Sequence, residues 1–293
     1  MKKIFCYLAS TVLVLASCAN LDHINTYATL STKALESQNS IGYSYAQHCQ
    51  DFVCSQELYY FPPYGKFQDT IPCDCEAYKL ADKALNTLNS VLSGYLTGLG
   101  KLSDKKAVNY NYDNLVKAID VDKIKNIVPI TSDQVTSLGK IATTVTNDLM
   151  DGYRKKKLKD IIKNTDPDFQ ILLGAYIGLM ETQFTIFLIG TDKSELANRY
   201  NRYFIEHKEN QTLPSYIKAQ YYQDYLVRAA KFNAYRDLTG KFIAALREIK
   251  AGHAKLALES DKLTEDTLKT AVNQYSADLY SIVQEFNKLK NSK

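Results

Sequence analysis

The chain has 293 residues, which is enough to bury a full hydrophobic core as one elongated domain or as two small ones. Its 36 Lys and Arg residues nearly balance its 32 Asp and Glu residues. This near-neutrality argues against a nucleic-acid-binding protein, because such binding rests on neutralising many phosphates. Only 12 Gly and 6 Pro residues are present, so helix breakers are few and the composition favours long helices over short strands.

The first residues have the pattern of a secretory signal. Lys2 and Lys3 give a charged start, and the twelve residues from 4 to 15 are mostly apolar. This run is well short of the roughly 20 apolar residues that a membrane-spanning helix needs. It therefore predicts a cleaved leader rather than a membrane span.

The end of the apolar run, Leu15-Ala16-Ser17-Cys18, resembles the lipobox of bacterial lipoproteins. The resemblance implies that residues 1–17 are a signal peptide, that Cys18 is acylated after cleavage, and that a lipid bilayer is one partner. Ala19 follows the cysteine where an Asp could stand, which fits export to the outer membrane. Residues 18–29 are then expected to be a short lipidated tether. The alternative is an ordinary secreted protein with a chance cysteine near its cleavage site.

Four more cysteines lie in residues 49–76, a segment with three prolines that is expected to be a loop. An even number of cysteines in an oxidising compartment predicts disulfides among Cys49, Cys54, Cys73 and Cys75. A Cys73–Cys75 bridge would strain the backbone across one intervening residue, so each of these two is expected to join either Cys49 or Cys54. The alternative is a metal site assisted by His48, but the spacing matches no common zinc pattern. Neither a metal nor a cofactor is expected.

An aromatic run, Tyr59-Tyr60-Phe61-Pro62-Pro63-Tyr64, lies between those cysteines. Rigid Tyr and Phe side chains on a crosslinked loop suit recognition of a protein or a glycan. Tyr59, Tyr60, Phe61 and Tyr64 are therefore candidate binding residues. The alternative is that these rings cap one end of the fold.

Residues 30–293 are predicted to form one helical-bundle domain. Two stretches, one over residues 76–102 and one after Thr264, have apolar residues spaced alternately four and three apart, as in the seam of a coiled coil. The seam positions are Ala81, Leu85, Leu88, Leu92, Tyr95, Leu99 and Leu102, and then Leu268, Val272, Tyr275, Leu279, Ile282, Phe286 and Leu289.

Further helices are expected over residues 30–48, 131–163, 166–189 and 192–207, and from Pro214 to about residue 256. Thr131 with Gln134, and Asp192 with Glu195, have the spacing of capping boxes, and Asp166-Pro167 has the pattern of an N-cap followed by a first helical residue. The last of these helices is expected to face inward with Tyr222, Tyr225, Ala229, Phe232, Phe242, Leu246, Ile249 and Leu256. The predicted fold is all-α: an elongated bundle of long antiparallel helices with coiled-coil-like seams and one disulfide-stapled loop.

Residues 169–189 are mostly apolar and include Gly174-x-x-x-Gly178, a spacing used for close helix contact in membranes. Gly174 and Gly178 are therefore candidates for a membrane-inserting segment. Glu181 lies in the middle, however, and a carboxylate at mid-bilayer costs at least ~2.5 kcal/mol. The composition thus favours a core helix over an inserting one.

The chain lacks the motifs H-E-x-x-H and G-x-S-x-G, a P-loop and G-x-G-x-x-G, so neither a catalytic residue nor an enzymatic activity is expected. His253 continues an inward stripe and is expected to be a core or rim residue. The expected function is a non-catalytic binding, adaptor or structural role in the cell envelope. Its partner would be an unidentified envelope or extracellular protein and no nucleic acid, and homo-oligomerisation through the seams is left open. The alternatives are a membrane-active or pore-forming protein using residues 169–189, an anchored immunity-type inhibitor and, last, an enzyme with a site in the bundle core.

Overall fold

The computed structural model describes residues 21–54, 73–104, 119, 121–144, 155–206 and 214–292. Over these ranges the chain is helical and contains no strand, which confirms the predicted all-α fold. The elements in chain order are α1 (Asp22–Glu36), η1 (Ser37–Ser40), α2 (Tyr45–His48), η2 (Cys49–Val53), α4 (Glu76–Ser103), α6 (Val121–Ile124), α7 (Ser132–Thr143), α8 (Lys155–Gly178), η5 (Leu179–Gly190), α9 (Thr191–Glu206), α10 (Ser215–Leu258), η6 (Ser260–Lys262) and α11 (Asp266–Asn291).

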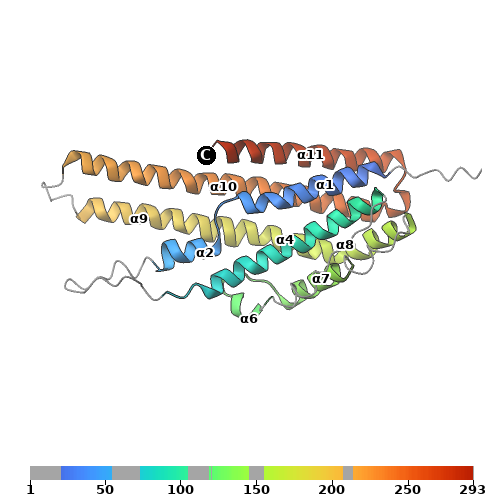
Figure 1. The fold of residues 1–293 in the computed structure, drawn as a ribbon, viewed down its shortest axis with the longest axis horizontal. Coiled ribbons are helices and arrows are strands. Elements are labelled where there is room, and N and C mark those ends of the chain that lie inside the picture. Colours follow the sequence, from blue (N-terminus) through green and yellow to red (C-terminus); the bar gives the residue numbers. More distant parts are fainter. Residues whose placement is uncertain are drawn as a thin grey trace, which may run out of the picture.

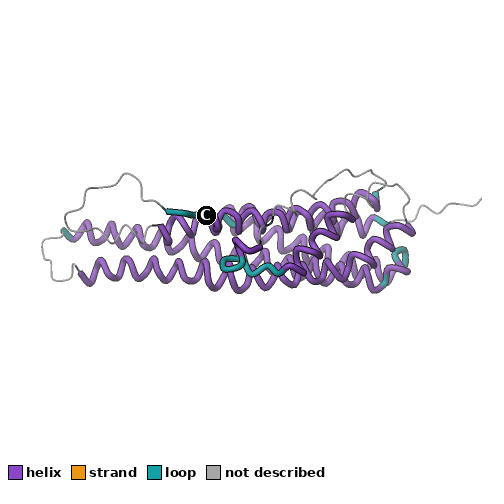
Figure 2. The backbone as a smooth tube through the Cα atoms, turned by 90° about the horizontal axis from the view of Figure 1, so that it is seen from below, coloured by secondary structure: helices purple, strands orange, loops and turns teal. Residues whose placement is uncertain are grey.

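The long helices lie lengthwise in one elongated bundle (Figures 1 and 2). α1 packs against α4 and α11, and α10 packs against α8 and α11. Following the chain, α1, α4, α8, α10 and α11 run alternately in opposite directions (Figure 1). α9 and the first part of α10 extend past the other helices as a hairpin at one end. The start of α1, whose N-cap residue is Leu21, lies at the opposite end, which also holds the turn between α10 and α11 (Figure 1).

Both predicted seams lie in the core. All seven seam positions of α4 are at most 5% exposed. In α11, the four positions Leu268, Val272, Leu279 and Phe286 are buried, and the other three are half-buried against them. α11 buries its seam against α10 and α1 of the same chain. The periodicity therefore pairs helices within one molecule.

The predicted capping box at the start of α7 is present. Thr131 Oγ1 accepts a hydrogen bond from the backbone N–H of Gln134 at 3.3 Å, and Gln134 Oε1 accepts one from the backbone N–H of Thr131 at 3.0 Å. These two bonds satisfy donors that a helix start otherwise leaves unpaired. The predicted continuation of this helix to residue 163 is wrong. α7 packs against α8, and Ser137 Oγ donates to Asp168 Oδ1 at 2.8 Å, so the two helices lie side by side and cannot form one continuous helix.

Two predicted helix starts are also wrong, because α8, η5 and α9 form one uninterrupted helical run from Lys155 to Glu206. Pro167 lies inside α8 rather than at its first position. Leu158 and Ile162, which precede Pro167, are fully buried, and their packing holds the helix across a proline that lacks a backbone donor. Asp192 likewise lies inside the run and caps nothing, since its side chain is turned to tertiary partners described below.

The predicted tether over residues 18–29 is wrong from residue 22 onward, as is a helix that starts only near Leu30. α1 begins at Asp22, and Ile24, Tyr27 and Ala28 are fully buried. Their spacing of three and one puts them on one face of the helix, which packs on α4, α10 and α11. This stretch is therefore part of the bundle rather than a flexible linker.

The segment predicted to be a loop over residues 49–76 is partly helical. η2, which follows α2 directly, covers its first residues, and α4 starts at its last one, Glu76. Ser44 caps α2 by accepting a hydrogen bond from the backbone N–H of Gln47 at 3.1 Å. The aromatic run with Tyr59, Tyr60, Phe61 and Tyr64, like Cys18 and the leader, lies outside the described residues.

Candidate functional site

The four predicted disulfide cysteines are joined as Cys49–Cys75 and Cys54–Cys73. This confirms that Cys73 and Cys75 each bond to one of the earlier pair, and it selects one of the two connectivities that the sequence left open. The four sulfur atoms lie within 4.8 Å of one another, a grouping that a metal could also produce. Pairwise bonding accounts for the grouping here. The two bridges fix α2 and η2 to the start of α4.

A polar cluster at the disulfide region joins three elements. The Asp192 side chain is only 1% exposed; it accepts a hydrogen bond from the Tyr43 hydroxyl and lies 2.8 Å from His48 Nδ1. Burial and the bond to this carboxylate raise the pKa of Tyr43. The cluster ties the segment before α2 to the first turn of α9. No sequence signal could have found it, because Tyr43 and Asp192 are 149 positions apart.

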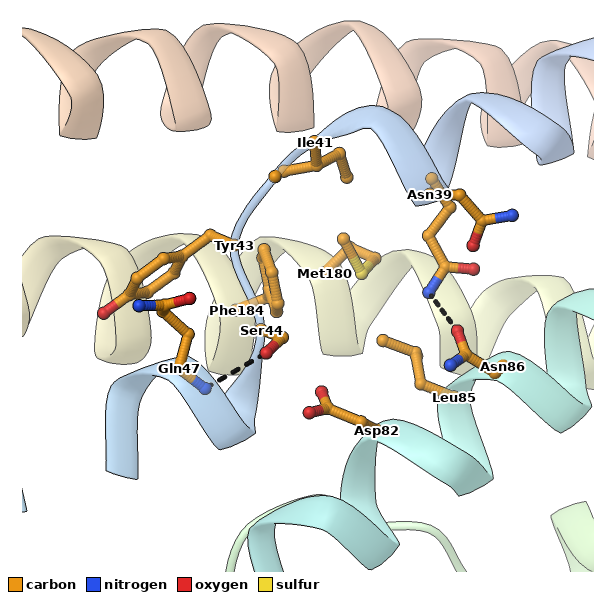
Figure 3. A pocket seen from close by; sticks show the side chains of 12 residues that line it. Asn39, Ile41, Tyr43, Ser44, Gln47, Asp82, Leu85, Asn86, Met180 and Phe184 are labelled. Carbon is orange, nitrogen blue, oxygen red and sulfur yellow. Dashed lines mark hydrogen bonds between the residues drawn. The ribbon is translucent and has the colours of Figure 1, made fainter. Parts of the chain in front are cut away.

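A cleft of about 380 Å³ adjoins this cluster (Figure 3). Its lining comes from residues 38–47, from α4 and from η5; the residues are Gln38, Asn39, Ile41, Gly42, Tyr43, Ser44, Gln47, Asp82, Leu85, Asn86, Met180 and Phe184. Asp82 lies at its edge and accepts hydrogen bonds from the backbone N–H groups of Tyr45 at 3.0 Å and Ala46 at 2.9 Å. Burial raises the pKa of Asp82, and these two bonds offset part of the rise.

A second polar cluster lies deep in the bundle core. His253 is fully buried, with its Nδ1 2.8 Å from Asp166 Oδ1 and its Nε2 2.7 Å from the Tyr95 hydroxyl. Burial lowers the pKa of His253, so the neutral ring is favoured. The order carboxylate, imidazole, hydroxyl resembles a proton relay, but both Tyr95 and His253 are 0% exposed, so a substrate cannot reach them. The cluster satisfies buried polar groups, and the prediction of His253 as a core residue is confirmed.

The projecting hairpin of α9 and α10 carries exposed aromatic side chains. Tyr216 is 69% exposed and Tyr222 is 51% exposed, so the prediction that Tyr222 faces inward is wrong. Tyr200, Tyr221 and Tyr225 instead form the contact between the two helices, with ring centroids 4.5 Å and 5.4 Å apart for the pairs that Tyr200 makes. Among the described residues, α9 lies along one face of this part of α10 (Figure 1), and the opposite face, which carries Tyr222, is exposed. Adjacent Tyr221 and Tyr222 could have indicated this, because neighbouring positions on a helix cannot share a face.

The apolar segment 169–189 packs into the bundle along one side. Nine of its hydrophobic side chains are buried, whereas Ile171, Ile186 and Phe187 are 49%, 62% and 56% exposed. An added Cβ at Gly178 would meet nothing within 4 Å, and one at Gly174 would meet only the Lys250 ammonium at 3.2 Å. The two glycines thus make no close helix contact within this fold. They remain candidates for membrane contact only as a prediction.

One helical run in the described chain, Lys157–Arg202, is long and apolar enough to cross a membrane by length and composition. Of its most apolar window, 39% is buried in the bundle. Core helices of soluble proteins meet the same criteria, so this feature alone does not decide between a core helix and a span.

Comparisons with family models, curated proteins and solved structures found no match to this chain.

Proposed function

We propose that this chain is a lipid-anchored protein of the bacterial cell envelope with a non-catalytic binding or adaptor role. The observation that carries the proposal is the placement of the exposed aromatic hairpin at the end of the bundle remote from Leu21 (Figure 1). An anchor on Cys18 would be only three residues before Leu21 in the chain. The hairpin would then face away from the membrane.

The length of α10 determines how far the hairpin lies from the anchored end of the bundle. Its 44 residues rise about 1.5 Å each, so the helix is about 66 Å long and runs from the hairpin to the Leu21 end. A bundle stiffened by long antiparallel helices would hold the hairpin at that distance from the anchored end. This geometry suits an adaptor that presents a surface to a partner in the envelope or outside it.

The hairpin surface has the composition of a protein-binding surface. On α10, Tyr216, Tyr222, Leu226 and Val227 are 69%, 51%, 40% and 58% exposed, and Ile205 on α9 is 71% exposed. Tyr side chains give a large, rigid and amphipathic contact area, and large exposed apolar groups that cluster on one part of a molecule mark interaction sites.

The test is affinity capture of the acylated protein from its native envelope after mild crosslinking, with partners identified by mass spectrometry. Tyr216→Ser combined with Tyr222→Ser should abolish recovery of a stoichiometric partner while leaving thermal stability unchanged. The matched control is Tyr280→Ser on α11, which removes a side chain that is 56% exposed and away from the hairpin. Equal partner recovery with the hairpin variant and the control would overturn the hairpin as the binding surface.

Anchoring is tested separately. The wild-type chain should partition into the detergent phase of a cell-envelope extract, and Cys18→Ser should move it to the aqueous phase. An aqueous wild-type chain would overturn the lipid anchor without bearing on the hairpin.

A membrane-active role is the second candidate, favoured by the exposure of Ile186 and Phe187 on the long apolar run. If that role is right, the chain should release dye from anionic liposomes, and Ile186→Asp with Phe187→Asp should stop the release. Absence of leakage with the wild-type chain would remove this candidate.

A further inference from the structure

The cleft beside α2 has an apolar floor and a polar wall. Ile41, Met180 and Phe184 form the floor and are at most 3% exposed. The wall consists of carboxamides: Asn39 lies above Asn86 of α4 (Figure 3), and Gln38, which also lines the cleft, is hydrogen-bonded to Asn86. Its volume of about 380 Å³ lies near the lower end of the range for small-molecule pockets, about 300–1,000 Å³.

The carboxamides of the wall are not saturated with hydrogen bonds. Gln38 Nε2 donates to Asn86 Oδ1 at 3.5 Å, the limit of such a bond, and Gln38 Oε1 is buried with no partner among the described residues. Asn86 Nδ2 carries two further N–H groups that no described residue accepts. A buried acceptor without a partner costs about 1–3 kcal/mol of desolvation. A ligand that donates to Gln38 Oε1 would recover that cost, and the same ligand could accept from the exposed Asn86 amide.

The charges around the cleft select against ions. None of the twelve described residues that line the cleft itself is Lys, Arg or His, so a phosphate or carboxylate bound inside it would contact no cationic side chain there. The one carboxylate, Asp82, already holds the start of α2 through two backbone N–H groups. Lys79 and Lys83 line the adjoining hollow on α4 together with Asp82, which disfavours a cationic ligand. The remaining class is a neutral ligand rich in hydrogen-bonding groups.

The walls of the cleft are fixed in place before any ligand arrives. Asp82 fixes α2 to α4, and Asp192 holds Tyr43 and His48 on the other side. The Cys49–Cys75 bridge secures the end of α2. Little conformational entropy is then lost on binding, because the side chains and backbone are already ordered.

We propose that this cleft binds a neutral polyhydroxylated molecule of the size of a monosaccharide unit. A sugar hydroxyl both donates and accepts, so it satisfies Gln38 Oε1 and Asn86 Nδ2 whichever way each carboxamide is turned. The site is independent of the hairpin and of the lipid anchor.

The experiment uses the purified mature chain and saturation-transfer NMR with a panel of glucose, galactose, mannose, N-acetylglucosamine and N-acetylgalactosamine at millimolar concentration. Inorganic phosphate and putrescine serve as charged comparators. At least one sugar should bind and the two ions should not. No binding by any sugar of the panel, or binding of phosphate or putrescine in its place, would overturn the proposal.

Two variants locate the binding in the cleft. Asn86→Leu should lower the affinity for the sugar about tenfold, because a hydrogen bond is lost and the new side chain obstructs the cleft. Gln38→Leu should weaken it similarly while leaving thermal stability equal or higher, because it removes an unpaired buried acceptor, so misfolding cannot explain the loss. The matched control is Ser90→Leu, which puts the same side chain one helical turn further along α4 and outside the cleft. Unchanged affinity in both cleft variants, or equal loss in the control, would refute this location.

Discussion

Gly252 in α10 lies against Tyr27 in α1, and this contact allows a test of the packing between the two helices. Replacing Gly by Ala inside a helix usually stabilises a protein, whereas here it should destabilise it. A Cβ at position 252 would lie 2.5 Å from Tyr27 Cε2 and 3.0 Å from Tyr27 Cζ. Tyr27 is fully buried, and its hydroxyl donates to the backbone carbonyl of Ile249 at 2.5 Å. The ring therefore cannot yield without giving up that bond. Gly252→Ala should destabilise the protein, although Ala is the better helix former.

The expected change in the free energy of unfolding is the balance of one stabilising and two destabilising contributions. Exchanging Gly for Ala inside a helix contributes about 1 kcal/mol of stability. Overpacking a filled core costs about 1–3 kcal/mol, and a displaced Tyr27 hydroxyl left without a partner costs about 1–3 kcal/mol more. The net expectation is a loss of about 1–5 kcal/mol in the free energy of unfolding. Gly240 provides the matched control, because it lies in the same helix with nothing within 4 Å of an added Cβ, and Gly240→Ala should gain about 1 kcal/mol.

Urea unfolding followed by circular dichroism measures both values. Tyr27→Leu combined with Gly252→Ala should cost less than the sum of the two single changes, because a smaller side chain removes the overlap. Stabilisation by Gly252→Ala equal to that by Gly240→Ala would show that α1 does not pack on α10 in this way. Strict additivity in the double variant would contradict Tyr27 as the obstructing group.

Three further predictions concern the core, the pH dependence and the disulfides. Leu279→Asp should leave the chain unfolded in far-UV circular dichroism, because the side chain is fully buried in the α11 seam, and a folded variant would show that this seam is not core. Burial lowers the pKa of both His23 and His253 below the ordinary value of 6.5, so at acidic pH the unfolded chain binds more protons than the folded chain. The free energy of unfolding should therefore fall as the pH drops below about 6.5 and on through the lowered pKa values. Equal urea midpoints at pH 7.5 and pH 5 would contradict this. Replacing Cys49 and Cys75 together by Ala should cost about 3–4 kcal/mol, the chain-entropy value for a loop of about 26 residues, and thiol labelling of the denatured, unreduced wild-type chain should find no free cysteine among the four.

The sequence alone determined those parts of the fold that depend on neighbours along the chain. The seams of α4 and α11 are visible because residues three and four apart share a helix face, so burial of that face is encoded locally. The capping box of Thr131 and Gln134 spans four residues and needs no tertiary partner. The disulfide expectation followed from cysteine count and from the strain of a bridge across one residue. In each case a short stretch of chain contains the whole physical cause.

The tertiary structure decided what depends on distant partners. Asp166 and Asp192 have the local pattern of helix caps, yet each side chain is turned to a histidine far along the chain, and the helix continues through both positions. The close packing of α1 on α10 depends on Tyr27 lying against Gly252, which has no side chain. The exposure of Tyr222 depends on where the neighbouring helices end. The cleft beside α2 depends on three segments that meet only in the fold. These outcomes are set by packing between elements, for which a local pattern carries no information.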